Sequence, residues 1–308
     1  MASIKELARK EDLLTGGHRL CAGCGAPIAV RQILKAAKTP VVAGSATCCL
    51  EVSTTPYPFT AWRTSYIHSA FENVAATVTG AEAAYKALKR SGKVKDDFTF
   101  VAFGGDGGTY DIGLQSLSGA LERGHNFTYV CYNNEAYMNT GTQRSGATPL
   151  GAWTSTTPAG SVVPGGKPDK RKDLTAIAAA HNIPYVAQSS PAFWKDLMRK
   201  AETAFDTPGP AFINVMAPCP RGWRYPSENT IEMAKLATET CVWPLYEVIN
   251  GEWKLNRKPK EKKPITDWLK PQGRFRHLFK PGNEHILQAV QESIDRDWEL
   301  LLKKCGEE

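Results

Sequence analysis

Four cysteines are the residues of this sequence best suited to holding a metal centre. Cys21 and Cys24 form a Cys-x-x-Cys pair, while Cys49 and Cys219 stand far away along the chain. Such a pair brings two thiolates close enough to share one centre, so the remaining ligands come from elsewhere in the fold. Pro220 follows Cys219 directly and fixes the turn there. We favour a 4Fe-4S cluster, because thiolates are the soft ligands gathered in this chain.

The same cysteines leave two other interpretations open. Four thiolates also make a tetrahedral site for structural zinc, and a Cys-x-x-Cys pair can act as a dithiol or stay inert and buried. Cys48 and Cys49 are adjacent, and neighbouring side chains cannot easily face one site, so we expect Cys49 to be the ligand. Cys131, Cys241 and Cys305 are expected to be small buried apolar side chains.

A glycine-rich turn that contains one carboxylate is the second candidate site. Gly104-Gly-Asp-Gly-Gly108 directly follows an apolar run, and Asn134 follows the next apolar run. Glycines let backbone N–H groups approach a diphosphate, and Mg²⁺ prefers a few hard oxygen ligands plus phosphate oxygens. Asp106 offers a carboxylate, Asn134 an amide oxygen and Ala136 a backbone carbonyl. The turn alone would also fit an ordinary strand-to-helix connection, but together with Asn134 it predicts a Mg²⁺–diphosphate site.

The elements around these residues predict a parallel α/β sheet. Apolar runs predict strands at 41–46, 98–103, 127–132, 185–188 and 211–217, alternating with helical patterns at 26–37, 73–88, 111–121, 173–181 and 192–205. This alternation is typical of a doubly wound sheet, in which ligands bind beyond the carboxyl ends of the strands. Four candidate residues directly follow predicted strands: Cys49, Asp106, Asn134 and Cys219. We therefore expect them along one edge of the sheet.

Two stretches lack this alternation. Residues 138–170 are rich in Gly, Thr, Ser and Pro, and a loop of this length inside a domain usually has a function. After about residue 222 the pattern breaks into a Pro- and Lys-rich tail with one further helix near 283–304. We expect a domain over 1–222 that binds cofactor and cluster, and a basic C-terminal extension over 223–308 that packs on this domain or on a partner subunit.

Composition and charge narrow the class of protein. The 308 residues carry a net charge of +7, much of it in 254–263 and 273–277, which we expect to be solvated basic surface. Neither zinc-finger spacing nor an RNA-recognition motif supports a nucleic-acid partner, whereas an acidic electron-transfer partner fits the charge. No apolar run reaches the roughly 20 residues of a membrane span. The N-terminus lacks the apolar core of a signal peptide, so we expect a cytoplasmic protein that uses cysteines for metal or redox chemistry rather than for disulfides.

Two common nucleotide-binding motifs are missing. The sequence contains no Gly-x-x-x-x-Gly-Lys-Ser/Thr, which argues against a P-loop nucleotidase, and no Gly-x-Gly-x-x-Gly, which argues against NAD or FAD.

Several longer segments, taken together, resemble one family. They are Gly17-His-Arg-Leu-Cys-Ala-Gly-Cys-Gly25, Cys49-Leu-Glu-Val52, Pro56-Tyr-Pro58 with Thr60-Ala-Trp62, His68-Ser-Ala-Phe-Glu-Asn73, Gly105-Asp-Gly107, and Asn134-Glu-Ala-Tyr-Met-Asn-Thr-Gly141 with Gln143-Arg-Ser-Gly146. The family is the thiamine-diphosphate-binding β subunit of pyruvate:ferredoxin oxidoreductase and related 2-oxoacid:ferredoxin oxidoreductases. The resemblance covers about residues 15–280.

This resemblance implies a role for each matching residue. Mg²⁺ and the diphosphate of thiamine diphosphate would be held by Asp106, Asn134 and the Ala136 carbonyl, with further diphosphate contacts from Gly107 and Thr140. Asn139 would face the reacting carbon and the substrate carboxylate, and His68 would line the cofactor site unless it is a lone histidine without that role. The 4Fe-4S cluster would be bound by Cys21, Cys24, Cys49 and Cys219, although Cys48 stands where relatives are expected to have glycine.

The resemblance also implies an activity. A 2-oxoacid, pyruvate by default, would be decarboxylated oxidatively to acyl-CoA and CO₂, with electrons passed through the cluster to ferredoxin. No glutamate in this chain suits the aminopyrimidine of the cofactor, so a partner would supply it, and the chain would be inactive without α-, γ- and δ-type subunits. Three alternatives remain: another 2-oxoacid or oxalate as substrate, a non-redox thiamine-diphosphate decarboxylase subunit, and a zinc-stabilised assembly subunit without catalysis.

Overall fold

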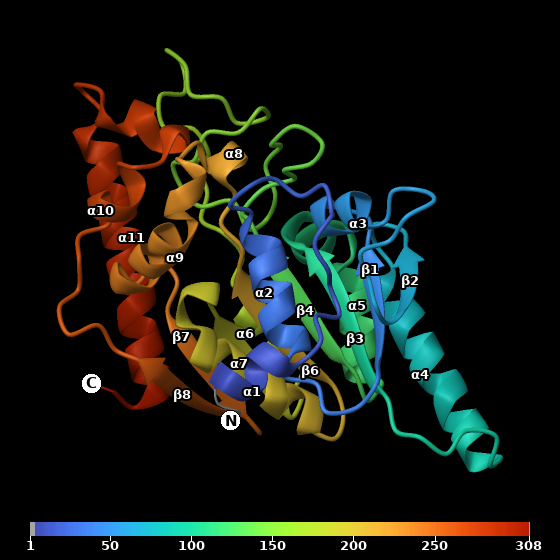
Figure 1. The fold of residues 1–308 in the computed structure, drawn as a ribbon. Coiled ribbons are helices and arrows are strands. Elements are labelled where there is room, and N and C mark those ends of the chain that lie inside the picture. The colour runs from blue at the N-terminus through green and yellow to red at the C-terminus, as the bar shows by residue number, and fades with distance from the viewer. Residues whose placement is uncertain (1–3, 308) are drawn as a thin grey trace.

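The backbone of this protein is organised around one eight-stranded mixed sheet (Figure 1). The structure is a computed structural model that describes residues 4–307. The strands are β1 (Val41–Ala46), β2 (Ser65–Ser69), β3 (Thr99–Gly105), β4 (Thr128–Asn133), β5 (Tyr185–Ser189), β6 (Ala211–Met216), β7 (Leu245–Ile249) and β8 (Glu252–Arg257), in the order β2-β1-β3-β4-β6-β5-β7-β8. The first six strands of this order run parallel, and β7 and β8 are antiparallel additions at one edge.

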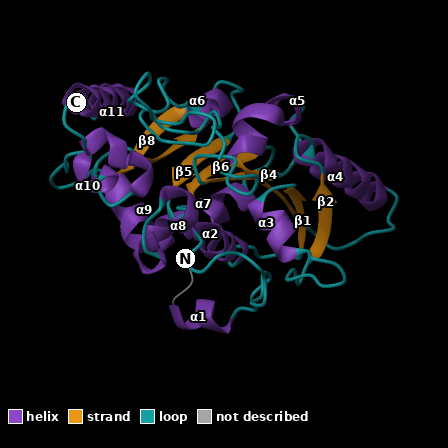
Figure 2. Ribbon diagram, turned by 90° about the horizontal axis from the view of Figure 1, so that it is seen from above, coloured by secondary structure: helices purple, strands orange, loops and turns teal. Residues whose placement is uncertain are grey.

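Helices cover both faces of the sheet, as the view from above shows (Figure 2). They are α1 (Ile4–Arg9), α2 (Gly25–Leu34), α3 (Cys49–Thr54), α4 (Val74–Arg90), α5 (Leu114–Glu122), α6 (Leu174–Ala179), α7 (Trp194–Asp206), α8 (Pro220–Trp223), α9 (Thr230–Glu239), α10 (Thr266–Leu269) and α11 (Glu284–Cys305). Alternate residues of each strand point to opposite faces, so one core packs α2 and α7 against the sheet and a second packs α4, α5, α6 and α11. The predicted doubly wound α/β fold is confirmed.

The predicted central strands are all present, with ends that differ by at most two residues. Strand β2 was not predicted, because it is a short edge strand with polar, partly exposed residues. The helix predicted from 111 is also different: a π-helix at 107–112 comes directly after Asp106, and α5 begins only at Leu114. The loop predicted over 138–170 contains neither helix nor strand.

The C-terminal part contradicts two expectations. Residues after 222 do not only form a tail with one helix: the β7–β8 hairpin joins the sheet beside β5, and α9 and α10 precede α11. Strand β8 was missed because it is an exposed, charged edge strand, which hides the alternation. Segment 273–277 is not solvated basic surface either, since Arg274 and Phe275 are buried. The division of the chain at 222 stays a prediction.

The carboxyl ends of β1, β3, β4 and β6 lie at one end of the sheet, toward the top of Figure 1. The loop 138–170, α3 and α8 gather at this same end. Because these strands are parallel neighbours, the residues that follow them meet there. Among the described residues, no helix combines the length and the apolar character needed to span a membrane.

Candidate cofactor and cluster site

Three oxygen atoms converge just beyond β3 and β4. Asp106 is 1% exposed and follows β3, and Asn134 follows β4. In one orientation of the Asn134 amide, its oxygen lies 2.8 Å from Asp106 Oδ1 and 2.8 Å from the Ala136 carbonyl oxygen; in the other, its nitrogen donates hydrogen bonds to both. Ligand oxygens at 2.0–2.1 Å from an octahedral Mg²⁺ stand about 2.9 Å apart. With its oxygen turned toward them, the Asn134 amide therefore stands from Asp106 and from the Ala136 carbonyl at the spacing of neighbouring magnesium ligands.

Burial dominates the electrostatics of this carboxyl group. It raises the pKa of Asp106 to about 7, although Ser145 Oγ and the backbone N–H of Asn134 both donate to the carboxylate. The nearby Glu135 carboxylate makes a smaller contribution in the same direction as burial. A carboxylate that is costly to ionise in isolation is stabilised by a bound cation, so the pKa shift fits the same conclusion as the oxygen spacing.

A pocket of about 120 Å³ opens above these oxygens. The turn Gly105–Gly108 forms one wall, Asn139 and Thr140 lie exposed at the mouth, and Cys48 and Cys49 form another wall. Gly107 has to be glycine, because a Cβ there would collide with the Tyr137 ring. Its carbonyl accepts a hydrogen bond of 3.2 Å from the Tyr137 hydroxyl. The predicted diphosphate residues thus share one pocket.

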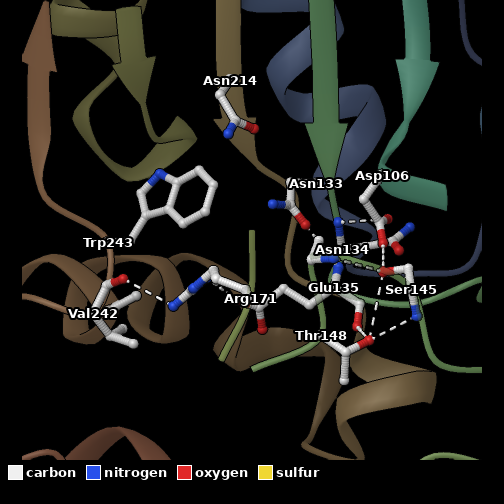
Figure 3. A network of polar contacts seen from close by, with 12 residues as sticks. Asp106, Asn133, Asn134, Glu135, Ser145, Thr148, Arg171, Asn214, Val242 and Trp243 are labelled. Atoms are coloured by element: carbon white, nitrogen blue, oxygen red, sulfur yellow. Dashed lines mark hydrogen bonds and ion pairs between the residues drawn. The ribbon is translucent and has the colours of Figure 1, made fainter. Parts of the chain in front are cut away.

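Glu135, between two of the proposed magnesium ligands, is fully buried and paired with two arginines, of which Figure 3 labels Arg171. Arg171 Nη1 lies 2.7 Å from Glu135 Oε1, and Arg274 Nη2 lies 2.6 Å from Oε2. Its backbone has φ +69°, an uncommon value for a residue other than glycine. Thr148 Oγ1 donates to the Glu135 carbonyl at 2.7 Å, and the Glu135 N–H donates to Asn133 Oδ1 at 2.9 Å. These contacts hold the backbone of the segment 134–136, which contains two of the proposed magnesium ligands.

Neither arginine could be assigned to Glu135 from the sequence pattern. Neither arginine is near Glu135 in the sequence, and Arg274 belongs to a segment that was expected to be solvated. The one available signal was a glutamate between two proposed ligands, directly after an apolar strand. Trp223 adds a further support, because its indole Nε1 donates to the Asn134 carbonyl at 2.8 Å and its ring stacks under Arg274 at 4.1 Å.

The four predicted cysteines lie around one region beside the pocket. Gly25 N–H donates to the Pro218 carbonyl at 3.0 Å, which joins the Cys-x-x-Cys segment to the turn that contains Cys219. Burial raises the pKa of Cys24 to about 12, and the charges of Cys219 and Cys21 raise it further. Burial likewise raises the pKa of Cys49, to which Cys48, Cys219 and Cys24 contribute. These interactions place the four thiols near one another.

Cys48 has different contacts from Cys49. Its thiol interacts with the Tyr132 hydroxyl and lies 3.2 Å from the Ala46 carbonyl oxygen. Burial raises its pKa to about 12. These contacts occupy the Cys48 thiol, which fits the prediction that Cys49 rather than Cys48 is the cluster ligand. Across residues 4–307, no three His, Cys, Asp or Glu side chains come close enough to bind a single metal ion. Zinc would need thiolates about 3.8 Å apart.

His68 does not line the pocket but contacts Thr47, which does. Its Nδ1 is 2.8 Å from Glu51 Oε1, and its Nε2 is 3.4 Å from Thr47 Oγ1. Thr47 lines the pocket, whereas His68 is not among its lining residues in the described chain. A direct contact between His68 and a cofactor remains a prediction.

Comparisons with known proteins agree with this geometry. Residues 42–215 match the model for the thiamine pyrophosphate enzyme, C-terminal TPP binding domain. The chain is 53% identical to pyruvate synthase subunit PorB of Thermotoga maritima, covering 97% of this chain and 95% of that one. It is 45% identical to ketoisovalerate oxidoreductase subunit VorB of Pyrococcus abyssi, covering 95% and 93%.

A solved structure shares the fold. It is the 2-oxoglutarate:ferredoxin oxidoreductase of Magnetococcus marinus, with a TM-score of 0.54 and 20% identity over 70% of this chain and 76% of that one. The sequence matches extend over nearly the whole chain and the matched domain contains the pocket described above. The chain therefore belongs to the family of thiamine-diphosphate-binding β subunits of 2-oxoacid:ferredoxin oxidoreductases.

Proposed function

We propose that this β subunit holds thiamine diphosphate through a magnesium ion bound by Asp106, Asn134 and the Ala136 carbonyl. The observation that carries the proposal is that the Asn134 amide lies 2.8 Å from both Asp106 Oδ1 and the Ala136 carbonyl oxygen, at the base of a glycine-walled pocket. Backbone N–H groups of the turn at Gly107 would bind the diphosphate, with Thr140 at the mouth. Thiamine diphosphate supplies a carbanion that attacks a 2-oxoacid and a ring that accepts the electron pair after CO₂ leaves.

In that scheme, the residues of this chain bind the cofactor and orient the substrate. Glu135, clamped by Arg171 and Arg274, keeps the two flanking ligands in place before a cation arrives, so that little ordering is required on binding. Asn139, exposed at the pocket mouth, is the side chain proposed to contact the substrate carboxylate. An amide can donate to a carboxylate without adding a charge that would compete with the magnesium site.

We assign the 4Fe-4S cluster to Cys21, Cys24, Cys49 and Cys219. The thiols raise one another's pKa, so they lie near one another. Cys49 also lines the cofactor pocket, so the cluster would lie directly beside the cofactor. Electrons leaving the substrate would thus enter a centre on the same chain and continue to ferredoxin.

The site is completed by a partner subunit in this proposal. A pocket of about 120 Å³ is smaller than typical ligand pockets of roughly 300–1,000 Å³, so it would enclose only part of the cofactor. After α3, Tyr57 and Phe59 are 97% and 72% exposed, which suits a face covered by another chain. That partner, an α-type subunit, would contribute the glutamate for the aminopyrimidine, with γ- and δ-type subunits completing the complex.

Pyruvate is the proposed substrate, with coenzyme A accepting the acyl group. The support is the similarity over nearly the full chain to PorB of Thermotoga maritima, which exceeds that to VorB of Pyrococcus abyssi. A branched 2-oxoacid is the second candidate because VorB is also similar. Turnover of pyruvate and of ketoisovalerate by the assembled enzyme decides between them.

The direct test is the cofactor content of the assembled enzyme, purified without oxygen. We expect about four iron, about four sulfide and about one thiamine diphosphate at this subunit. An Asp106→Asn variant should lose thiamine diphosphate and keep its iron, whereas Cys305→Ser should change neither. Zinc in place of iron would refute the cluster and support an assembly subunit, and iron retained without any thiamine diphosphate in the wild type would refute the cofactor site.

A further inference from the structure

The loop 138–170 contains a buried cation that the proposed chemistry does not use. The Lys167 side chain is 1% exposed, and its ammonium group contacts backbone carbonyls of the described chain rather than a carboxylate. Burial lowers the pKa of Lys167 to about 8, so keeping the charge inside the fold is costly. Lysines are almost never fully buried without a partner, which indicates a specific role for this one.

The three donors of the ammonium group match three acceptors. Lys167 Nζ lies 2.7 Å from the Thr148 carbonyl oxygen, 2.8 Å from that of Asp169 and 2.9 Å from that of Lys170. The loop has neither helix nor strand, so buried carbonyls in it need donors of this kind. Lys167 therefore joins Thr148 to a part of the loop about twenty residues further along the chain.

The main chain of Lys167 is bound to the same stretch. Its N–H donates to the Ala152 carbonyl at 3.0 Å, and its carbonyl accepts from the Gly151 N–H at 2.9 Å. These two hydrogen bonds do not involve the side chain. Replacing the side chain therefore removes the support of Thr148 without removing the backbone pairing that holds the loop.

Thr148 connects this anchor to the residues around the proposed magnesium ion (Figure 3). Its Oγ1 donates to the Glu135 carbonyl at 2.7 Å and accepts from the Ser145 N–H at 3.0 Å. Ser145 Oγ in turn donates to Asp106 Oδ2. Ser145 and Thr148 are both fully buried, so water does not compete for these contacts.

The contact with Ser145 orients the Asp106 carboxylate. Ser145 holds Oδ2, whereas Oδ1 lies 2.8 Å from the Asn134 amide, on the side of the proposed cation. Groups that orient metal ligands in this way typically change metal affinity 10- to 100-fold when they are removed. A shift of Thr148 would therefore reach Asp106 through Ser145.

We propose that Lys167 is a positioning residue for the magnesium site. It holds Thr148, and through Thr148 it holds Ser145 and Asp106 in the arrangement that the cation requires. The inference rests on the proposed magnesium and thiamine diphosphate site, and it gives the loop 138–170 the function of delivering Ser145 to the carboxylate.

The test is titration of the assembled, cofactor-stripped enzyme with Mn²⁺ at saturating thiamine diphosphate, followed by EPR. Mn²⁺ takes the same octahedral oxygen ligands as Mg²⁺. Lys167→Met should bind Mn²⁺ at least about tenfold more weakly and change the spectrum of the bound ion, with the iron content unchanged. Lys170→Met is the matched control, because that side chain is half exposed and paired with Asp297, and it should bind Mn²⁺ as the wild type does.

Variants of Thr148 test the route. Thr148→Val removes the hydroxyl and should weaken Mn²⁺ binding about as much as Lys167→Met does, whereas Thr148→Ser keeps the hydroxyl and should bind like the wild type. In the double variant of Lys167→Met with Thr148→Val, the loss should be smaller than the two single losses combined. A merely structural role for the lysine would not give this rescue or this coupling.

Three results would overturn the positioning role and leave the proposed function intact: wild-type Mn²⁺ affinity in Lys167→Met, fully additive losses in the double variant, or equal affinity in Thr148→Val and Thr148→Ser. The last comparison does not depend on the folding of Lys167→Met. A wild-type enzyme that binds no Mn²⁺ with thiamine diphosphate would overturn the proposed function, and this inference with it.

Discussion

Replacing Arg274 with methionine should damage the proposed magnesium site, although Arg274 is not one of its proposed ligands. The guanidinium is buried, forms one of the two ion pairs to Glu135, and stacks on Trp223. Methionine keeps much of the side-chain volume and removes the charge. Breaking a buried pair by removing one partner costs about 3–5 kcal/mol. Because Arg171 still holds the other Glu135 oxygen, we expect a loss near the lower end, about 3 kcal/mol.

The assay separates stability from cofactor binding. Denaturant unfolding of the assembled enzyme should show the stability loss, and titration with Mg²⁺ and thiamine diphosphate should show at least tenfold weaker binding. Arg276→Met is the matched control, since Arg276 is exposed two residues away. Arg274→Lys should recover only part of the loss, because it keeps the charge but not the planar fork.

A double-mutant cycle identifies the cause. If the damage comes from an uncompensated Glu135 carboxylate, adding Glu135→Gln to Arg274→Met should cost less than the two single changes summed. Additive effects in the cycle, or an Arg274→Met variant that binds thiamine diphosphate as well as Arg276→Met does, would refute the idea that this ion pair positions the ligands.

Three further predictions concern the ionisation of the magnesium ligand, the choice of the fourth thiol and the partner face. Since the pKa of Asp106 is raised to about 7, the metal-free chain should lose stability as pH rises from about 4 to about 7. Over the same range the affinity for Mg²⁺, measured by titration, should rise roughly tenfold per pH unit, and it should stay constant above about pH 7. Cys49→Ser should lose cluster iron and Cys48→Gly should keep it; iron analysis giving the reverse would exchange their roles. Tyr57→Ala should weaken subunit association at least tenfold by sedimentation, and unchanged association would exclude it as an anchor.

The predictable part of this protein was the part encoded locally. Strands buried on both faces give continuous apolar runs, so β1, β3, β4 and β6 and their carboxyl-end residues could be located from the sequence. Asp106 and Asn134 then had to be neighbours, because β3 and β4 pair in parallel. The same argument placed Cys49 and Cys219 at that edge.

The unpredictable part depends on contacts between distant charged residues. Arginines are mostly exposed, so composition alone assigns Arg274 to the surface. Its burial is stable only because Glu135, 139 positions earlier, accepts its charge inside the fold. The left-handed backbone at Glu135 is equally hidden from a pattern of residue types, because the sequence offers no glycine or asparagine at that position to signal it.

The short helix α8 connects the two halves of the proposed chemistry. It begins directly after Cys219, whose thiol accepts a 3.3 Å hydrogen bond from Gly222 N–H, and it ends at Trp223, whose indole holds the Asn134 carbonyl. A proposed cluster ligand and a proposed magnesium ligand are therefore joined by four residues of regular backbone. Arg274, from the C-terminal part of the chain, stacks on the same indole ring. A residue outside the matched range 42–215 thus contacts the one side chain that links the two proposed sites.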